Sequence, residues 1–159
     1  MAQVLIIYYS RSGNTAKMAE LVAEGVRASG ANVAVKKVEN VSVEELLKND
    51  GIIIGSPTYY GTMAAEIKKF IDESVKYHGQ LVGKVGGAFA SSGGLAGGNE
   101  TTVLDIVKAF LIHGMIIPGN VEGDHYGAAA VGAPDRRSAE QCRILGKLVG
   151  DLCRRLATR

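Results

Sequence analysis

Hydrophobic residues occur in two kinds of run along this chain of 159 residues. Short, continuous apolar runs are too brief for helix cores and are typical of strands buried on both faces of a sheet. They predict strands at about residues 3–9, 33–38, 51–55, 84–90 and 115–118. Helical spacing of apolar residues predicts helices at about residues 14–29, 43–48, 64–77, 99–113 and 136–157. Each strand precedes a helix, which favours a parallel sheet covered by helices on both faces.

The length of the chain fits a single domain over residues 1–159. A chain of this size buries roughly two thirds of its unfolded surface. The run at 33–38 alternates and is more polar than the others, as expected for an edge strand. Ser42, followed by Glu45 three residues later, indicates a capping box at the start of the short helix at 43–48. We therefore expect a three-layer, doubly wound α/β sandwich.

The first loop follows the first strand and is rich in hydroxyls. It comprises Ser10, Arg11, Ser12, Gly13, Asn14 and Thr15. Hydroxyls and backbone N–H groups at the positive end of a helix favour a phosphate, and the glycine allows close approach or a positive φ. The loop lacks the Gly-Lys-Ser/Thr of a Walker A motif, the three glycines of a dinucleotide fingerprint and a nucleophilic cysteine. This pattern predicts a fixed, non-reacting phosphate.

Two further loops follow the third and fourth predicted strands and are also rich in Gly, Ser, Thr or Tyr. In an open parallel sheet, ligands bind beyond the carboxyl ends of the strands, so all three loops are expected at one edge. The second loop, residues 56–63, carries Tyr59 and Tyr60, which suit a planar ligand or simply cap the sheet edge. The third loop, residues 91–100, holds enough glycine for backbone amides to lie against a ligand, or is a mobile linker.

Composition and charge exclude several partners. The net charge is +2, and basic residues are interleaved with acidic ones, so no nucleic-acid binding is expected. No apolar run reaches the length of a membrane span, and no leader pattern precedes the first strand. We therefore expect a cytoplasmic location and no stable membrane insertion. Cys142 and Cys153 fall in the last predicted helix roughly 16 Å apart, too far for a disulfide, and are expected to be buried.

Taken together, these features resemble the flavodoxin-like family of FMN proteins, and more closely its WrbA-type NAD(P)H:quinone oxidoreductases. The resemblance covers nearly the whole chain and rests on the following segments: residues 8–15 (Tyr-Tyr-Ser-Arg-Ser-Gly-Asn-Thr), 57–63 (Pro-Thr-Tyr-Tyr-Gly-Thr-Met), 89–100, 113–115 (His-Gly-Met) and 126–128 (Tyr-Gly-Ala). It implies a flavodoxin-like sandwich with a five-stranded parallel sheet in the order 2-1-3-4-5. It also implies one noncovalently bound FMN and two-electron transfer from NAD(P)H to a quinone.

The resemblance assigns roles to residues of this chain. Those expected to bind FMN are Ser10, Arg11, Ser12, Gly13, Asn14, Thr15, Pro57, Thr58, Tyr59, Tyr60, Gly61, Ser91, Ser92, Gly93, Gly94 and Leu95. The first loop would hold the phosphate, Tyr60 and Gly61 would lie against the ring, and residues 91–95 would close the pyrimidine side.

The three histidines have different expected roles. By residue type alone, His113 is best explained as a structural group at a helix end. The resemblance instead places it near the flavin, at the carboxyl side of the sheet, as the catalytic candidate that stabilises charge on the reduced flavin or the quinone oxygen. His125 is expected to line the substrate opening and His78 to be a solvated helix end. No pair has metal-ligand spacing, so no metal site is expected.

The chain also departs from the WrbA type. Only residues 39–50 separate the second and third strands, where that type carries a long insertion, and residues 119–125 are likewise short. Those insertions support the family's tetramer and shape its substrate mouth, and Tyr59 stands where the quinone reductases often place Arg. A flavodoxin-type single-electron carrier therefore remains the alternative, followed by a binding module that has lost its flavin. A homo-oligomer is the default for such enzymes.

Overall fold

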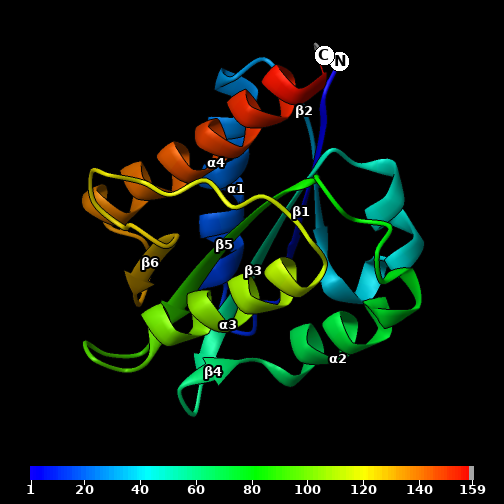
Figure 1. Cartoon of the computed structure of the whole chain (residues 1–159). Coiled ribbons are helices and arrows are strands. Elements are labelled where there is room, and N and C mark those ends of the chain that lie inside the picture. Colours follow the sequence, from blue (N-terminus) through cyan, green and yellow to red (C-terminus); the bar gives the residue numbers. More distant parts are fainter. Residues whose placement is uncertain (158–159) are drawn as a thin grey trace.

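A parallel sheet forms the centre of the protein in the computed structural model, which describes residues 1–157 (Figure 1). Its strands are β1 (Gln3–Tyr8), β2 (Asn32–Lys37), β3 (Gly51–Tyr59), β5 (Val85–Ser92) and β6 (Ala128–Val131). They lie in the order β2-β1-β3-β5-β6, and the short strand β4 (Thr62–Met63) pairs antiparallel with the end of β3. The predicted order 2-1-3-4-5 is confirmed once the main strands are numbered along the chain.

Helices cover both faces of this sheet (Figure 1). One layer holds α1 (Asn14–Ala28) and α4 (Arg136–Ala157), and the other holds α2 (Ala65–Glu73) and α3 (Asn99–Ile112). Short 3-10 helices η1 (Val38–Asn40), η2 (Val43–Lys48) and η3 (Ser74–Tyr77) complete the second layer, and η2 begins with the predicted capping box. Among residues 1–157, no helix has the length and apolar character needed to cross a membrane.

The buried strand β1 shows how one sequence serves two cores. Side chains alternate across a strand, so Val4 and Ile6 pack in the cluster with α1 and α4, while Leu5 and Ile7 pack in the cluster with α2 and α3. All four are almost completely buried. The continuous apolar run is therefore explained by burial on both faces, as predicted.

The first helical layer is held together at close range. A Cβ built on Gly146 would lie 1.9 Å from the carbonyl oxygen of Val22, and one on Gly25 would lie 2.0 Å from that of Arg143. Side chains larger than hydrogen cannot fit there, so α1 and α4 contact each other backbone to backbone. Cys142 and Cys153, on α4, are free and buried as expected, and burial raises the pKa of each thiol to about 12.

The last strand of the sheet lies later in the chain than the apolar run at 115–118 predicts. In that run Ile116 makes one isolated parallel bridge with Val85, and the chain then leaves the sheet. It returns as β6, which pairs with residues 89–92 of β5. The segment predicted as the last strand therefore makes only this one bridge, and β6 forms the edge of the sheet. Three of the four residues of β6 are alanines, which carry little strand propensity, so its sequence does not indicate a strand.

Candidate functional site

The carboxyl ends of β1, β3 and β5 bring the three loops to one edge of the sheet, as predicted. Hydrogen bonds join the first loop to the third and the second loop to the start of α3. The hydroxyls of Thr15 in the first loop and Ser91 in the third lie 2.9 Å apart. The hydroxyl of Thr101, at the start of α3, donates to the carbonyl oxygen of Gly61 in the second loop at 2.8 Å. These contacts make one connected surface, which we call the three-loop site (residues 10–15, 56–63 and 91–100).

The first loop leaves the amino end of α1 available to an anion. Gly13 precedes the helix with φ of 96°, a conformation that favours glycine, and its N–H donates to the Ser10 hydroxyl at 3.1 Å. Glycine has no side chain with which to cap the helix, and the first turn contains no acidic residue. The helix dipole and the backbone N–H groups are therefore not neutralised by a carboxylate of this turn, which is what a phosphate requires.

The second loop is a two-residue hairpin turn that presents an aromatic ring to solvent. Tyr60 and Gly61 connect β3 to β4 with φ of 48° and 81°. A tyrosine in the left-handed region is uncommon and costs about 1 kcal/mol or more. The Tyr60 side chain is fully exposed, so no packing within the chain compensates for this conformation. An exposed ring on a strained turn indicates a surface built for a ligand.

Hydrogen bonds of Ser92 hold the third loop in a defined turn. The hydroxyl of Ser92 donates to the carbonyl oxygen of Gly94 at 3.0 Å and accepts from the Asn99 amide at 3.1 Å. A Cβ built on Gly93 or Gly94 would meet no atom within 4 Å, and the same is true of Gly13 and Gly61 in the other loops. Open space therefore lies over backbone in all three loops.

Three side chains of α3 bind the second loop and are not among the residues expected at the site. They are Thr101, whose contact with Gly61 is given above, Thr102 and Asp105. The hydroxyl of Thr102 donates to the hydroxyl of Thr58 at 3.1 Å, and the hydroxyl of Thr62 donates to Asp105 at 2.6 Å. The adjacent threonines in the first turn of α3 are the one feature of the sequence that could have indicated that this helix holds the second loop. Their partners lie about 40 residues earlier in the chain, so tertiary contact was needed to identify them.

His113 lies at the opposite edge of the sheet, and its expected placement is wrong. A helix that follows a parallel strand runs back toward the amino ends of the strands, and His113 comes directly after α3. Its Nε2 lies 2.8 Å from the Ser74 hydroxyl, and its ring centroid lies 6.2 Å from that of His78. The side chain is buried, which together with the charge of His78 lowers its pKa. Within one chain, His113 is therefore a structural residue remote from the three-loop site.

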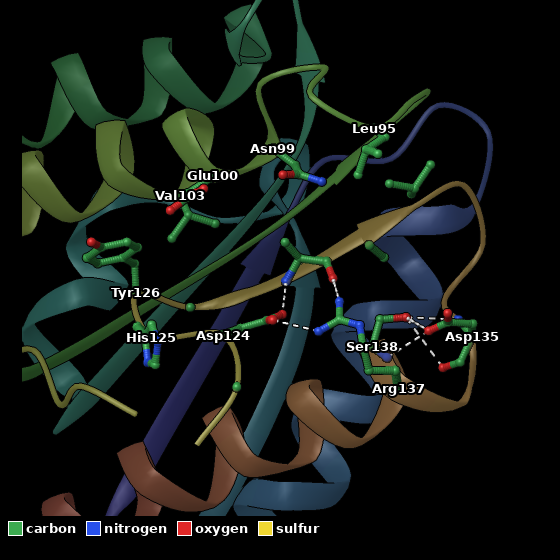
Figure 2. A pocket seen from close by; sticks show the side chains of 15 residues that line it. Leu95, Asn99, Glu100, Val103, Asp124, His125, Tyr126, Asp135, Arg137 and Ser138 are labelled. Atoms are coloured by element: carbon green, nitrogen blue, oxygen red, sulfur yellow. Dashed lines mark hydrogen bonds and ion pairs between the residues drawn. The ribbon is translucent and has the colours of Figure 1, made fainter. Parts of the chain in front are cut away.

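A separate cavity of about 520 Å³ adjoins the third loop. It lies between α3, β6, residues 123–127 and the start of α4, and Figure 2 shows Glu100 and Val103 facing Asp124 and Arg137 across it. His125 lines this cavity, and its expected place at the substrate opening stays a prediction. Among residues 1–157, no group of three His, Cys, Asp or Glu side chains is arranged to hold a metal ion.

Comparison with known proteins agrees with this geometry. A family model described as a flavodoxin domain matches residues 5–111. The chain belongs to the flavodoxin family. Among similar proteins, a "Flavodoxin" of Aquifex aeolicus is 39% identical over 95% of this flavodoxin-family chain and 86% of its own length. An "NAD(P)H dehydrogenase (quinone)" of Archaeoglobus fulgidus is 36% identical over 98% of the chain and 100% of its own length.

Solved structures of flavodoxins superpose over nearly the whole flavodoxin-family chain. The flavodoxin, WrbA-like protein from Agrobacterium tumefaciens matches with a TM-score of 0.82 and 29% identity, covering 98% of this chain and 99% of its own. A flavodoxin from the domain Archaea matches with a TM-score of 0.80 and 27% identity, covering 96% and 99%. The flavodoxin-like fold and the resemblance inferred from the sequence are confirmed.

FMN is the cofactor of this flavodoxin-family protein, and the three-loop site fits it. The first loop offers hydroxyls, backbone amides and the exposed Arg11 side chain at an end of α1 whose first turn contains no carboxylate, which suits a dianionic phosphate. The open space over the loop glycines and the exposed Tyr60 ring suit a planar ring system.

Proposed function

We propose that this protein transfers two electrons from NAD(P)H to a quinone through one noncovalently bound FMN. The observation that carries the proposal is the three-loop site, where an anion-binding helix end and an exposed tyrosine ring lie on one connected surface. The names of several relatives support it, because they describe NAD(P)H dehydrogenases that act on quinones. Hydride acceptance and electron release are the chemistry that FMN supplies when bound.

The chain's own residues position the cofactor. In this proposal, residues 10–15 hold the phosphate through hydroxyls and amides, and the Thr15–Ser91 hydrogen bond keeps the first loop in register with the third. Pro57, Thr58, Tyr59, Tyr60 and Gly61 lie along the ring. The third-loop residues Ser91, Ser92, Gly93, Gly94 and Leu95 close its other side with backbone amides.

In this proposal, water is excluded from only one side of the bound ring. Ser91 and Ser92 are buried at the end of β5, whereas Tyr60 and Leu95 are exposed at the rim. A ring bound between them is open to a small-molecule donor or acceptor from the solvent side. No residue of the three-loop site is a buried acid or histidine, so protons for the reduced quinone come from solvent in this mechanism.

A flavodoxin-type carrier of single electrons between proteins is the second candidate. It is favoured by the relative from Aquifex aeolicus named "Flavodoxin" and by the short segment between β2 and β3. Such a carrier would bind FMN in the same site but would not react with NAD(P)H.

An anaerobic stopped-flow experiment separates the two candidates. FMN-loaded protein is mixed with NADH or NADPH, the flavin spectrum is followed, and benzoquinone is then added. Rapid two-electron bleaching followed by reoxidation with quinone supports the oxidoreductase. Flavin that stays oxidised with either nucleotide, but gives a long-lived one-electron-reduced form on stepwise dithionite titration, refutes it in favour of the carrier.

A further inference from the structure

The cavity beside the third loop borders the proposed flavin site, and the proposed function leaves its interior without a ligand. Its volume of about 520 Å³ lies in the range of small-molecule sites. It shares Leu95, Asn99 and Glu100 with the third loop and no residue with the first or second. A molecule that fills it therefore lies beside the flavin loop and not over the ring. This position suits the distal half of a ligand whose other half reaches the flavin.

Part of the cavity wall is apolar and aromatic. The Tyr126 ring is 51% exposed and the Leu95 side chain 93% exposed, with Val103 and Val131 nearby in the lining. Exposed leucine and tyrosine side chains in one concave surface favour a planar group, because its binding would remove their apolar area from water.

The polar wall consists mainly of acceptors. Nδ1 of His125 lies 2.8 Å from the Asn120 carbonyl oxygen, which can only accept, so Nδ1 carries the hydrogen and Nε2 of the neutral ring is an acceptor. Glu100 lies in the first turn of α3, and its exposed carboxylate makes no hydrogen bond or ion pair with other residues in the part of the chain described. Both groups match hydroxyl and amino donors.

The charges of the lining disfavour an anion. Glu100, Asp124 and Asp135 contribute three carboxylates, against the single guanidinium of Arg137. That guanidinium is engaged, with Nη1 donating to Asp124 at 2.6 Å and Nη2 to the carbonyl oxygen of Ala129 at 2.9 Å (Figure 2). Arg136 lines a groove on the outer face of α4 and does not line the cavity.

We propose that this cavity binds the adenosine half of the nicotinamide cofactor and selects NADH over NADPH. The inference rests on the proposed function, since it names the electron donor of that reaction. Adenosine is uncharged and offers ribose hydroxyls to Glu100 and a planar base to the Tyr126 ring. The 2′-phosphate of NADPH would add up to two negative charges among carboxylates that have no free cation to offset them. Acidic side chains select the free ribose diol for the same reason in other nucleotide sites.

Steady-state kinetics of the FMN-loaded protein test the selectivity. The wild type is expected to use NADH with at least a tenfold higher kcat/KM than NADPH. Glu100→Gln should lower kcat/KM for NADH about tenfold, mainly through KM, because the charged acceptor of a hydrogen bond is replaced by a neutral amide oxygen. Glu100→Arg should reverse the preference. Glu122→Gln is the matched control, since Glu122 is exposed on the adjacent loop but does not line the cavity, and it should behave as the wild type.

Three kinetic results would overturn the selectivity. They are equal use of NADH and NADPH by the wild type, an unchanged nucleotide ratio in Glu100→Gln, and loss of selectivity in Glu122→Gln. Arg136→Gln addresses the opposite reading: if it abolishes use of NADPH, the 2′-phosphate binds outside the cavity and the inference is wrong.

A binding measurement separates this inference from the proposed function. ADP-ribose carries the adenosine half but has no nicotinamide with which to reduce the flavin, so its binding to the FMN-loaded protein is followed by calorimetry and by amide chemical shifts. Shifts are expected at residues 95–103 and 123–138, and Tyr126→Leu should weaken binding about fivefold through lost stacking. Shifts elsewhere overturn the cavity assignment even if NADH reduces the flavin. ADP-ribose binding in the cavity without flavin reduction by NADH supports the cavity assignment and refutes the proposed electron donor.

Discussion

Replacing Thr15 by valine removes one hydroxyl from the three-loop site while keeping the shape of the side chain. Thr15 is 2% exposed, and its hydroxyl lies 2.9 Å from that of Ser91, which is itself 5% exposed. In the flavin-free protein the substitution leaves the Ser91 hydroxyl buried without this partner. An unpaired buried hydroxyl costs about 1–3 kcal/mol. The free energy of unfolding measured with urea should fall by that amount, and Tm by roughly 2–12 °C.

The same variant tests the phosphate site. A hydrogen bond to a charged group contributes about 1.5–3 kcal/mol, so loss of the Thr15 hydroxyl should raise the Kd for FMN roughly 10- to 150-fold. The assay is a titration of FMN fluorescence with flavin-free protein. Riboflavin, which lacks the phosphate, should lose little affinity. Thr15→Ser keeps the hydroxyl and should bind FMN almost as tightly as the wild type.

Two outcomes would refute this reasoning. If Thr15→Val binds FMN as tightly as the wild type, the first loop does not use this hydroxyl for the phosphate. If the variant loses equal affinity for FMN and riboflavin, the valine acts by displacing the third loop. A double-mutant cycle with Ser91→Ala measures that second effect, because directly bonded residues show coupling energies of about 0.5–3 kcal/mol.

Three further predictions concern pH, helix packing and the second loop. Burial and the nearby His78 lower the pKa of His113, so the folded chain binds fewer protons than the unfolded chain below about pH 6.5 and its stability should fall there. When the free energy of unfolding is measured with urea between about pH 7.5 and 5, it should depend less on pH in His113→Gln than in the wild type. An equal dependence on pH in the two proteins would contradict this prediction. Gly146→Ala places a Cβ 1.9 Å from the Val22 carbonyl oxygen and should cost about 1–3 kcal/mol or more by the same assay, whereas wild-type stability would show that the helices can separate freely. Tyr60→Asn relieves the strain of the positive φ, because asparagine tolerates this conformation, but it removes the ring. The stability of the flavin-free protein should therefore be kept while its affinity for FMN falls about two- to tenfold. Unchanged affinity would argue against stacking of the ring on the flavin.

The sequence allowed several features to be predicted because each depends on neighbouring residues. The apolar run of β1 requires burial on both faces, and Gly13 in a hydroxyl-rich loop indicates an anion site at the start of a helix. The capping box of η2 is likewise encoded in four consecutive residues. Alternation of strands with helices then placed the three loops at one edge, because parallel strands all end on the same side.

Other features were decided only by contacts between distant segments. The alanines of β6 form a strand because the exposed edge of β5 pairs with them, and not through their own propensity. His113 faces Ser74 because α3 runs back across the sheet, a direction that residue type does not reveal. The cavity near Tyr126 exists because segments at 95–103 and 123–138 close around it, with Asp124 held by Arg137. Local sequence thus determined the helices, the strands other than β6 and the first loop, whereas chain direction and long-range packing determined β6 and which side chains share a site.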